Sequence, residues 1–366
     1  MKEVEDSRCS TLATAVFAAG DRRFNATDIV EAAWFRGDLP ALWQEFLIGI
    51  AGERRAEEEG LEPEGEALQT LSEDVRYKHD LITAEETETW LTARNLTLDD
   101  LTAYAHRRFW REHTAAPALP ADTGYLEATP EQREQFIADL FFGGQLDELA
   151  RRLSWRVAGA VAPVPSDPAL SIRLEAERAR FSQRTASDPG KLSEWLGQLG
   201  RDGPWFETLL AQESGHRWNC DQTSTTENRV RTLAALRLPL TCFEVELMDL
   251  ESADAVREAC FCLSTDGLSM EELAGQEHNR VERREILLEE FPEELQQQFL
   301  SAETGHVLPL ITTVGRFQVC RIVHKREPVL ADEKVLARVD AELLAGHFGN
   351  LVAKQIVWLI GPNAAA

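Results

Sequence analysis

Apolar residues recur at helical spacing through the first part of the chain. Leu42, Phe46 and Ile50 stand at positions i, i+4 and i+8, which places them on one face of a helix. Pro40 suits the first turn of that helix, because the N–H that proline lacks has no helical partner there. The pattern predicts helices throughout the segment from residue 9 to about residue 113.

A capping box marks the start of another helix in the same region. Thr83 and Glu86 are spaced so that each side chain can bond a free backbone N–H of the first turn. Trp90 begins the apolar face that follows. We therefore expect a helix from about residue 84, with its apolar face turned towards the core of a helical domain.

The middle of the chain is harder to divide by periodicity. The stretch 115–120, rich in Ala and Pro, has the composition of a linker. Residues 155–164 are rich in Val, Ala and Gly, which predicts a strand. Between residues 187 and 226, repeated Gly and Pro interrupt every period, and no element is predicted.

The last third mixes two-residue alternation with helical periods. Residues 240–247 alternate as a half-buried strand does. The elements predicted after it are helices over 252–263 and 270–274, a short strand over 285–288, a helix over 291–300, strands over 308–312 and 317–323, and a final helix over 332–358. This order predicts a compact α/β domain whose last helix packs back on the N-terminal helices.

The predicted fold class is α+β, with four segments. They are a helical domain over 1–115, a mixed linker or insert region over 121–235, an α/β domain over 238–328 and a C-terminal helix over 329–362. The chain has 366 residues, of which 43% are hydrophobic. That length and composition are enough for more than one well-packed core.

The chain is strongly acidic, which narrows the classes of partner. Asp and Glu number 63 against 38 Lys and Arg, for a formal net charge of -25. Because this charge repels phosphates and anionic lipids, neither nucleic acid nor a membrane is expected as a partner, and a basic or apolar peptide fits better. The N-terminus lacks the layout of a signal peptide, and the six Cys show no disulfide spacing. We therefore expect a cytoplasmic protein with reduced thiols.

One group of metal-ligand residue types stands together in the chain. A spacing of four can place His216 and Cys220 on one helix face, and Asp221 is a third candidate ligand for zinc or iron. No second ligand pair with a recognised spacing accompanies them, and they read equally well as unrelated polar residues. We therefore predict no cofactor and keep these three residues as the candidates for a metal ion.

Two cysteines lie close together in the last third. Cys260 and Cys262 are two residues apart, so on a helix they point about 200° apart and cannot easily share a metal. At least one of them is expected to be buried. A cysteine nucleophile paired with His306 or His324 stays an alternative, although nothing in the sequence orients such a pair.

Four segments of the last third, residues 254–259, 266–274, 294–310 and 315–322, resemble in this order the parvulin-type peptidyl-prolyl isomerases. Residues 254–259 and 266–274 are similar to the first helix pair of the family, 294–310 to its next helix and strand entry, and 315–322 (GRFQVCRI) to its Gly-Tyr-His strand. Residues 24–112 resemble, more weakly, the helical domain that precedes parvulin modules in PpiC/SurA-like foldases. The resemblance implies a mostly helical SurA-like domain, a small parvulin-like α/β domain and a C-terminal helix that returns to the helical domain.

This chain departs from the parvulin pattern where that family has two histidines. Phe243 or a neighbour occupies the first position and Gln318 the second, while charged residues over 276–284 replace a Gly-rich stretch. The resemblance therefore implies a peptide-binding groove without a working isomerase site, and it identifies no catalytic residue. The positions that it assigns to peptide contact are Phe243, Val245, Phe291, Phe299, Pro309 and Gln318.

The function implied by the resemblance is the maturation of a peptide. Degenerate parvulins with a helical front half occur beside the tailoring enzymes of ribosomally made peptide natural products. The implied partners are a precursor peptide and a tailoring enzyme, or a second copy of the chain, and the implied role is presentation, tailoring or cyclisation of the peptide. The alternatives are an active cytoplasmic peptidyl-prolyl isomerase and chaperone, and an oligomerising scaffold. If the chain is an enzyme, it is a peptide-modifying maturase or a weak isomerase.

Overall fold

A computed structural model describes most of the chain. The described residues are 11–63, 65–113, 124–161, 170–185, 191–265, 268–277, 279–311 and 317–361. The predicted linker over 115–120 and the link between the last two predicted strands lie outside them. The chain divides into two compact units, unit 1 with Met1–Cys220 and His347–Ala366 and unit 2 with Asp221–Gly346.

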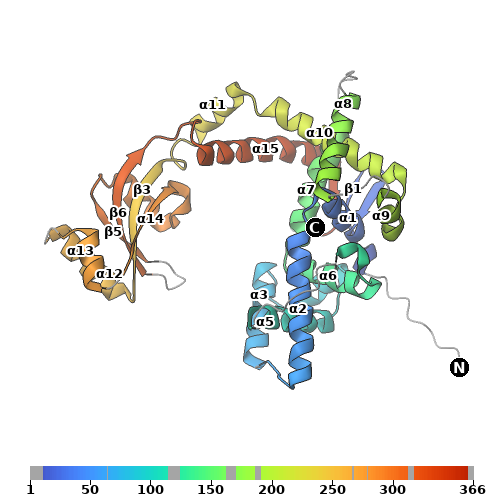
Figure 1. The fold of residues 1–366 in the computed structure, drawn as a ribbon, viewed down its shortest axis with the longest axis horizontal. Coiled ribbons are helices and arrows are strands. Elements are labelled where there is room, and N and C mark those ends of the chain that lie inside the picture. Colours follow the sequence, from blue (N-terminus) through green and yellow to red (C-terminus); the bar gives the residue numbers. More distant parts are fainter. Residues whose placement is uncertain are drawn as a thin grey trace. The chain divides into compact units, whose positions relative to one another are not determined.

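Unit 1 is mostly helical and carries a small sheet (Figure 1). All nine tryptophans of the chain belong to it. Its elements are η1 (Thr11–Ala13), β1 (Ala15–Ala19), β2 (Arg22–Asn25), α1 (Ala26–Arg36), α2 (Pro40–Glu59), α3 (Gly65–Lys78), α4 (Ala84–Ala93), α5 (Leu98–His113), η2 (Tyr125–Glu127), α6 (Pro130–Phe142), α7 (Gln145–Val161), α8 (Leu170–Thr185), α9 (Lys191–Leu199), most of α10 (Gly203–Thr223) and β7 (Ile356–Trp358).

The sequence had predicted that the N-terminal segment is helical throughout, but the structure places two strands in it. Strands β1 and β2 form an antiparallel hairpin, and β7 pairs antiparallel with the other edge of β1. The apolar residues of β1 do not alternate with polar ones, so the pattern that marks a strand is missing. Asn25 ends the hairpin and caps α1 through a capping box with Asp28.

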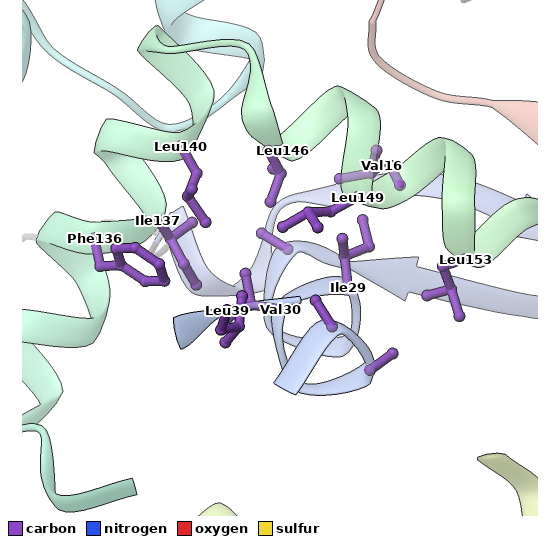
Figure 2. Packing of buried hydrophobic residues seen from close by; sticks show 14 of the residues in the cluster. Val16, Ile29, Val30, Leu39, Phe136, Ile137, Leu140, Leu146, Leu149 and Leu153 are labelled. Atoms are coloured by element: carbon purple, nitrogen blue, oxygen red, sulfur yellow. The ribbon is translucent and has the colours of Figure 1, made fainter. Parts of the chain in front are cut away.

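The core of unit 1 lies where β1, α1, α6 and α7 pack together (Figure 2). Val16, Ile29, Ile137 and Leu146 are fully buried in it. Helix α7 runs through residues 155–161, where the sequence had predicted a strand. Its small residues serve close helix packing instead, since a Cβ on Gly159 would stand 3.3 Å from the Phe348 ring.

One hydrophobic core joins the predicted domains 1–115 and 121–235. The Trp43 and Phe136 rings pack edge to face with centroids 5.0 Å apart, and the Phe35 and Phe206 rings do so at 5.5 Å. All four side chains belong to the same buried cluster. The expected boundary between residues 115 and 121 therefore does not separate two cores.

The C-terminal segment returns to the helical part of the protein, as predicted. Helix α15 (Glu333–Gln355) ends three residues earlier than expected, and β7 follows it. The Trp358 ring lies 5.5 Å from the Phe17 ring of β1, and Leu351 and Val352 pack against the unit 1 core. The edge of the small sheet is thus completed by residues more than three hundred positions away along the chain.

Unit 2 contains a four-stranded antiparallel sheet in the order β4-β3-β6-β5, with helices around it (Figure 1). The order of elements along the chain agrees with the parvulin-like prediction, and the fold class is α+β. The elements are α11 (Thr226–Ala235), β3 (Cys242–Leu250), α12 (Ala253–Thr265), α13 (Met270–Glu277), β4 (Val281–Leu287), η3 (Leu288–Glu290), α14 (Glu293–Ser301), β5 (Val307–Ile311), β6 (Phe317–Arg326) and most of α15.

The sheet of unit 2 buries both of its faces in part. On one face, Phe243 and Leu247 of β3 belong to a core cluster that α14 also joins. On the other face, Met248 packs in a second cluster with residues of α12 and α13. None of the helices in the described part of the chain combines the length and the apolar surface needed to span a bilayer.

Candidate functional site

The sequence had placed the peptide contacts in unit 2, mainly on aromatic residues. Phe243 and Val245 are fully buried on β3, and Phe291 and Phe299 are only 4% and 1% exposed. The Phe291 and Phe299 rings stack with centroids 3.8 Å apart, and Phe243 meets both rings edge to face. These four side chains form the core of the domain, so a peptide cannot contact them in this conformation.

The remaining two predicted contact residues lie on β5 and β6. Pro309 is half-buried and stands opposite Val319 in the sheet. Gln318, at the position of the second parvulin histidine, is 8% exposed, and its Nε2 donates to Asp249 Oδ1 at 2.8 Å. A carboxamide held by a neighbouring carboxylate is neither a base nor a nucleophile, so this position offers no acid–base chemistry.

The opposite face of the sheet holds a buried carboxylate. Glu246 is 1% exposed and accepts hydrogen bonds from Arg283 of β4 and Arg321 of β6. Burial opposes ionisation of Glu246, but the two guanidinium groups prevail and hold its pKa below its ordinary value. All three residues stand at one register level of the sheet, so their contacts tie β4, β3 and β6 together.

The three candidate metal ligands lie on helix α10. Cys220 Sγ is 3.9 Å from His216 Nε2, so the expected side-by-side placement of these two residues is correct. Burial, with Arg156, Arg217, Arg36 and His347 nearby, lowers the pKa of His216 to about 3. Arginines around a site repel a cation, and the described residues contain no group of three ligand side chains that could hold a metal ion.

The candidate cysteine nucleophiles are poorly placed for catalysis. Cys260 and Cys262 are both half-buried, so neither is fully buried as expected, and burial raises the pKa of the Cys260 thiol. A raised pKa leaves little thiolate at neutral pH. His306 and His324 are exposed, and neither bonds a cysteine in the part of the chain described. This arrangement does not support the alternative of a Cys–His pair.

Unit 1 contains a groove that the sequence did not predict. Its volume is about 1050 Å³, which is ample for several residues of an extended peptide. The walls come from the end of α3 and the turn after it, from α4, from the start of α7 and from the residues that follow β7. We call this hollow the unit 1 groove; its apolar surface is supplied by Leu81, Trp90, Leu359 and Ile360.

Local backbone geometry holds the rim of the unit 1 groove in place. The predicted capping box is present, with Glu86 accepting from the Thr83 N–H at 2.7 Å and Thr83 accepting from the Glu86 N–H at 3.1 Å. Gly144 has φ +71, a conformation that glycine adopts without strain. Lys78 closes the same corner by donating from Nζ to the Gly143 carbonyl at 2.5 Å.

A buried guanidinium lies at the groove beside a tryptophan. Arg94 is 5% exposed, and its guanidinium carbon lies 4.1 Å from the Trp90 ring centroid. Nη1 donates to the Trp90 carbonyl at 3.1 Å, while Nε has no hydrogen-bond partner among the described residues. Burial lowers the pKa of Arg94 to about 10 against the opposing charge of Asp147, so the group remains a cation at neutral pH.

Two further ionisable groups share this site. Burial raises the pKa of Asp147, although the charges of Arg94 and His79 act against it. Burial lowers the pKa of His79, whose Nε2 lies 3.1 Å from the Phe142 carbonyl oxygen and whose ring packs 4.7 Å from Trp90. The groove therefore combines apolar walls with a buried cation and a carboxylate, which is the composition of a site for a polar chain with apolar side groups.

The sequence matches no protein-family model and no curated protein. Among solved structures, PrsA, a peptidylprolyl isomerase of Bacillus anthracis, is 9% identical over 56% of this chain and 96% of that one, with a TM-score of 0.32. PrsA of Bacillus cereus is 11% identical over 59% and 85%, with a TM-score of 0.36. A SurA-like chaperone of Campylobacter jejuni is 10% identical over 60% and 88%, with a TM-score of 0.19.

These structures belong to the group that the sequence resembles, the parvulin-type isomerases and SurA-like chaperones. Their identities and TM-scores are too low to carry an argument about chemistry.

Proposed function

We propose that this chain is a peptide-binding protein of the parvulin-chaperone type that holds an extended peptide in the unit 1 groove and does not isomerise proline bonds. The observation that carries the proposal is the groove itself, with Trp90 and Leu81 on its walls and Arg94 buried beside them. An apolar cleft with a few fixed polar groups binds a flexible chain through both its side chains and its backbone.

The structure of unit 2 supports the proposal that the chain does not isomerise proline bonds. A prolyl isomerase needs an open site that desolvates and twists the imide bond. In unit 2, the Phe243 side chain is fully buried and Gln318 is bonded to Asp249. We infer that unit 2 keeps the parvulin architecture without its catalysis, and that Pro309 and Gln318 are at most accessory contacts for the peptide.

The substrate that we propose is the precursor peptide of a ribosomally made natural product, presented to a tailoring enzyme. The sequence resemblance suggests this setting, and the acidic character of the chain favours a basic or apolar peptide. We also propose a cytoplasmic location. The free thiols of Cys242 and Cys320, both buried, fit a reducing compartment.

Two measurements on the full-length protein test the proposal. We expect an array of short peptides of varied sequence to show saturable binding, with a preference for basic and apolar members. We expect a proline-containing chromogenic peptide to isomerise at its uncatalysed rate. Catalysis well above that rate would establish the alternative of an active isomerase, and an array without any binding would leave the scaffold role.

A further inference from the structure

Arg94 differs from other buried arginines of unit 1 in lacking a carboxylate partner. Arg107 contacts Asp139 at 2.5 Å, and Arg36, whose side chain is 4% exposed, contacts Asp38 at 2.7 Å. Across the described residues no ion pair includes Arg94, although its side chain is 5% exposed. A buried cation is costly without a partner, so a site that keeps one points to a ligand that supplies the missing contact.

Asp147 is the complementary group of the same groove. It lines the groove, and within the described chain it makes neither a hydrogen bond nor an ion pair. Asp147 and Arg94 line the same groove, and no hydrogen bond or ion pair joins them in the described part of the chain. A donor cation and an acceptor anion are therefore both available to a molecule that enters the groove.

We propose that the space between Arg94 and Asp147 holds one main-chain amide of an extended peptide, whose carbonyl oxygen accepts from the Arg94 guanidinium and whose N–H donates to the Asp147 carboxylate. This inference rests on the proposed function and names the chemistry of its site. A neutral amide satisfies both charges at once. A carboxylate would be repelled by Asp147, and an ammonium group would be repelled by Arg94.

The charges around the groove define the class of peptide. Four acidic residues and two basic residues line it, and one of the basic residues, Lys78, is already engaged with the Gly143 carbonyl. Glu85 is exposed on the rim. The groove therefore favours a peptide with apolar residues at its centre, opposite Trp90, and with Lys or Arg towards its ends.

The test uses the full-length protein and a fluorescein-labelled peptide of alternating Ala and Leu with a lysine near each end and an amidated C-terminus. This peptide has no Asn, Gln or free carboxylate, so the amides available to the groove are those of the main chain. Anisotropy is measured for the wild type, for Arg94→Met and for Asp147→Leu. Arg178→Met is the matched control, because Arg178 also lies over an aromatic ring, that of Phe206, and does not line the groove.

We expect Arg94→Met and Asp147→Leu each to weaken binding by about 10- to 100-fold, the effect of losing a hydrogen bond to a charged group, and Arg178→Met to leave it unchanged. N-methylation of the central amides should weaken binding to the wild type by a similar factor. It should add little to the effect of Asp147→Leu, since both changes remove the same bond. The N-methylated peptide tests the proposal on the wild type alone, so this test remains valid even if a variant does not fold.

Different failures overturn different statements. Binding by the wild type that neither variant nor N-methylation weakens would overturn the amide contact and leave the proposed function intact. Binding that appears only with a free C-terminal carboxylate would assign Arg94 to that group and also overturn the amide contact. A wild type that binds no peptide at all would overturn the proposed function together with this inference.

Discussion

Gln318 and Asp249 face each other across the β3–β6 pair, and the Gln318 carboxamide donates a 2.8 Å hydrogen bond to the Asp249 carboxylate. This contact occupies the position where the parvulin pattern has a histidine. We therefore expect Gln318→His to leave proline isomerisation at its uncatalysed rate, because Phe243 or a neighbour stands at the other histidine position and the Phe243 ring is buried. The measurement is the rate with a proline-containing chromogenic peptide.

The same substitution has a predicted effect on stability. Losing one side-chain hydrogen bond at a nearly buried position should lower the free energy of unfolding by about 1 kcal/mol. Hydrogen exchange of β3 and β6 amides measures this locally. Faster isomerisation by Gln318→His would contradict the view that unit 2 lacks a catalytic site, whatever happens to its stability.

A second prediction concerns pH and His216. The pKa of this imidazole is lowered from its ordinary 6.5 to about 3 by burial and by nearby arginines. The unfolded chain binds a proton at this residue below pH 6.5, whereas the folded chain does not until about pH 3. The contribution of His216 to the free energy of unfolding is therefore complete above pH 6.5. It decreases as the pH falls towards 3, by up to about 1.4 kcal/mol per pH unit.

Tryptophan fluorescence measures this effect in unit 1 alone, because all nine tryptophans belong to that unit. Denaturant unfolding between about pH 7 and pH 5 should show a smaller loss of stability for His216→Leu than for the wild type. His113, which is exposed, provides the control substitution His113→Leu. Equal pH dependence in His216→Leu and the wild type would show that His216 is not held neutral.

Parts of this fold could be predicted from the sequence because their signals are local. The strand β3 and the Thr83–Glu86 capping box are each signalled by residues a few positions apart, and both are present in the structure, although β3 is buried on both faces rather than half-buried. Strand β1 could not be predicted in this way. Its partners are β2, next to it in sequence, and β7 at Ile356–Trp358, and its apolar run fits a helix as well as a strand.

The unit 1 groove could not be predicted from the sequence, for a physical reason. Its walls come from residues 78–94, 144–147 and 359–361, which only the tertiary fold brings together. Trp90 and Arg94 are one helical turn apart, but that spacing alone does not distinguish a groove from a core contact. The aromatic residues predicted for peptide contact are buried in the structure, and Phe291 and Phe299 have the same sequence signature whether they line a groove or fill a core.

Gly144 provides a third prediction, on the frame of the unit 1 groove. Its φ of +71 is strained for any residue with a Cβ, and an added Cβ would stand 2.9 Å from Lys78 Cε. The lysine chain can move, so the backbone strain dominates, and Gly144→Ala should lower stability by about 1 to 2 kcal/mol. Gly197→Ala is the control: Gly197 lies inside α9 with open space around it, so that change should raise stability by up to about 1 kcal/mol. Both shifts can be followed by tryptophan fluorescence; an equal gain in both variants would contradict the argument.

A fourth prediction compares the two arginines that hold Glu246 in unit 2. The Glu246 side chain is 2% exposed, while those of Arg321 and Arg283 are 30% and 61% exposed. Removing Arg321 leaves a buried carboxylate with only its more solvated partner, so Arg321→Met should cost about 2 to 3 kcal/mol. Arg283→Met should cost less than Arg321→Met, because water already screens that contact.

Hydrogen exchange of the β3 amides measures both costs without interference from unit 1. Arg326→Met is the matched control, since Arg326 stands further along β6 and pairs with the exposed Glu285. We expect that variant to exchange like the wild type. If Arg283→Met destabilised β3 as much as Arg321→Met, the exposure of the two guanidinium groups would not determine their contributions. The buried carboxylate would then depend equally on both arginines, because losing either one would leave it with an unmet charge.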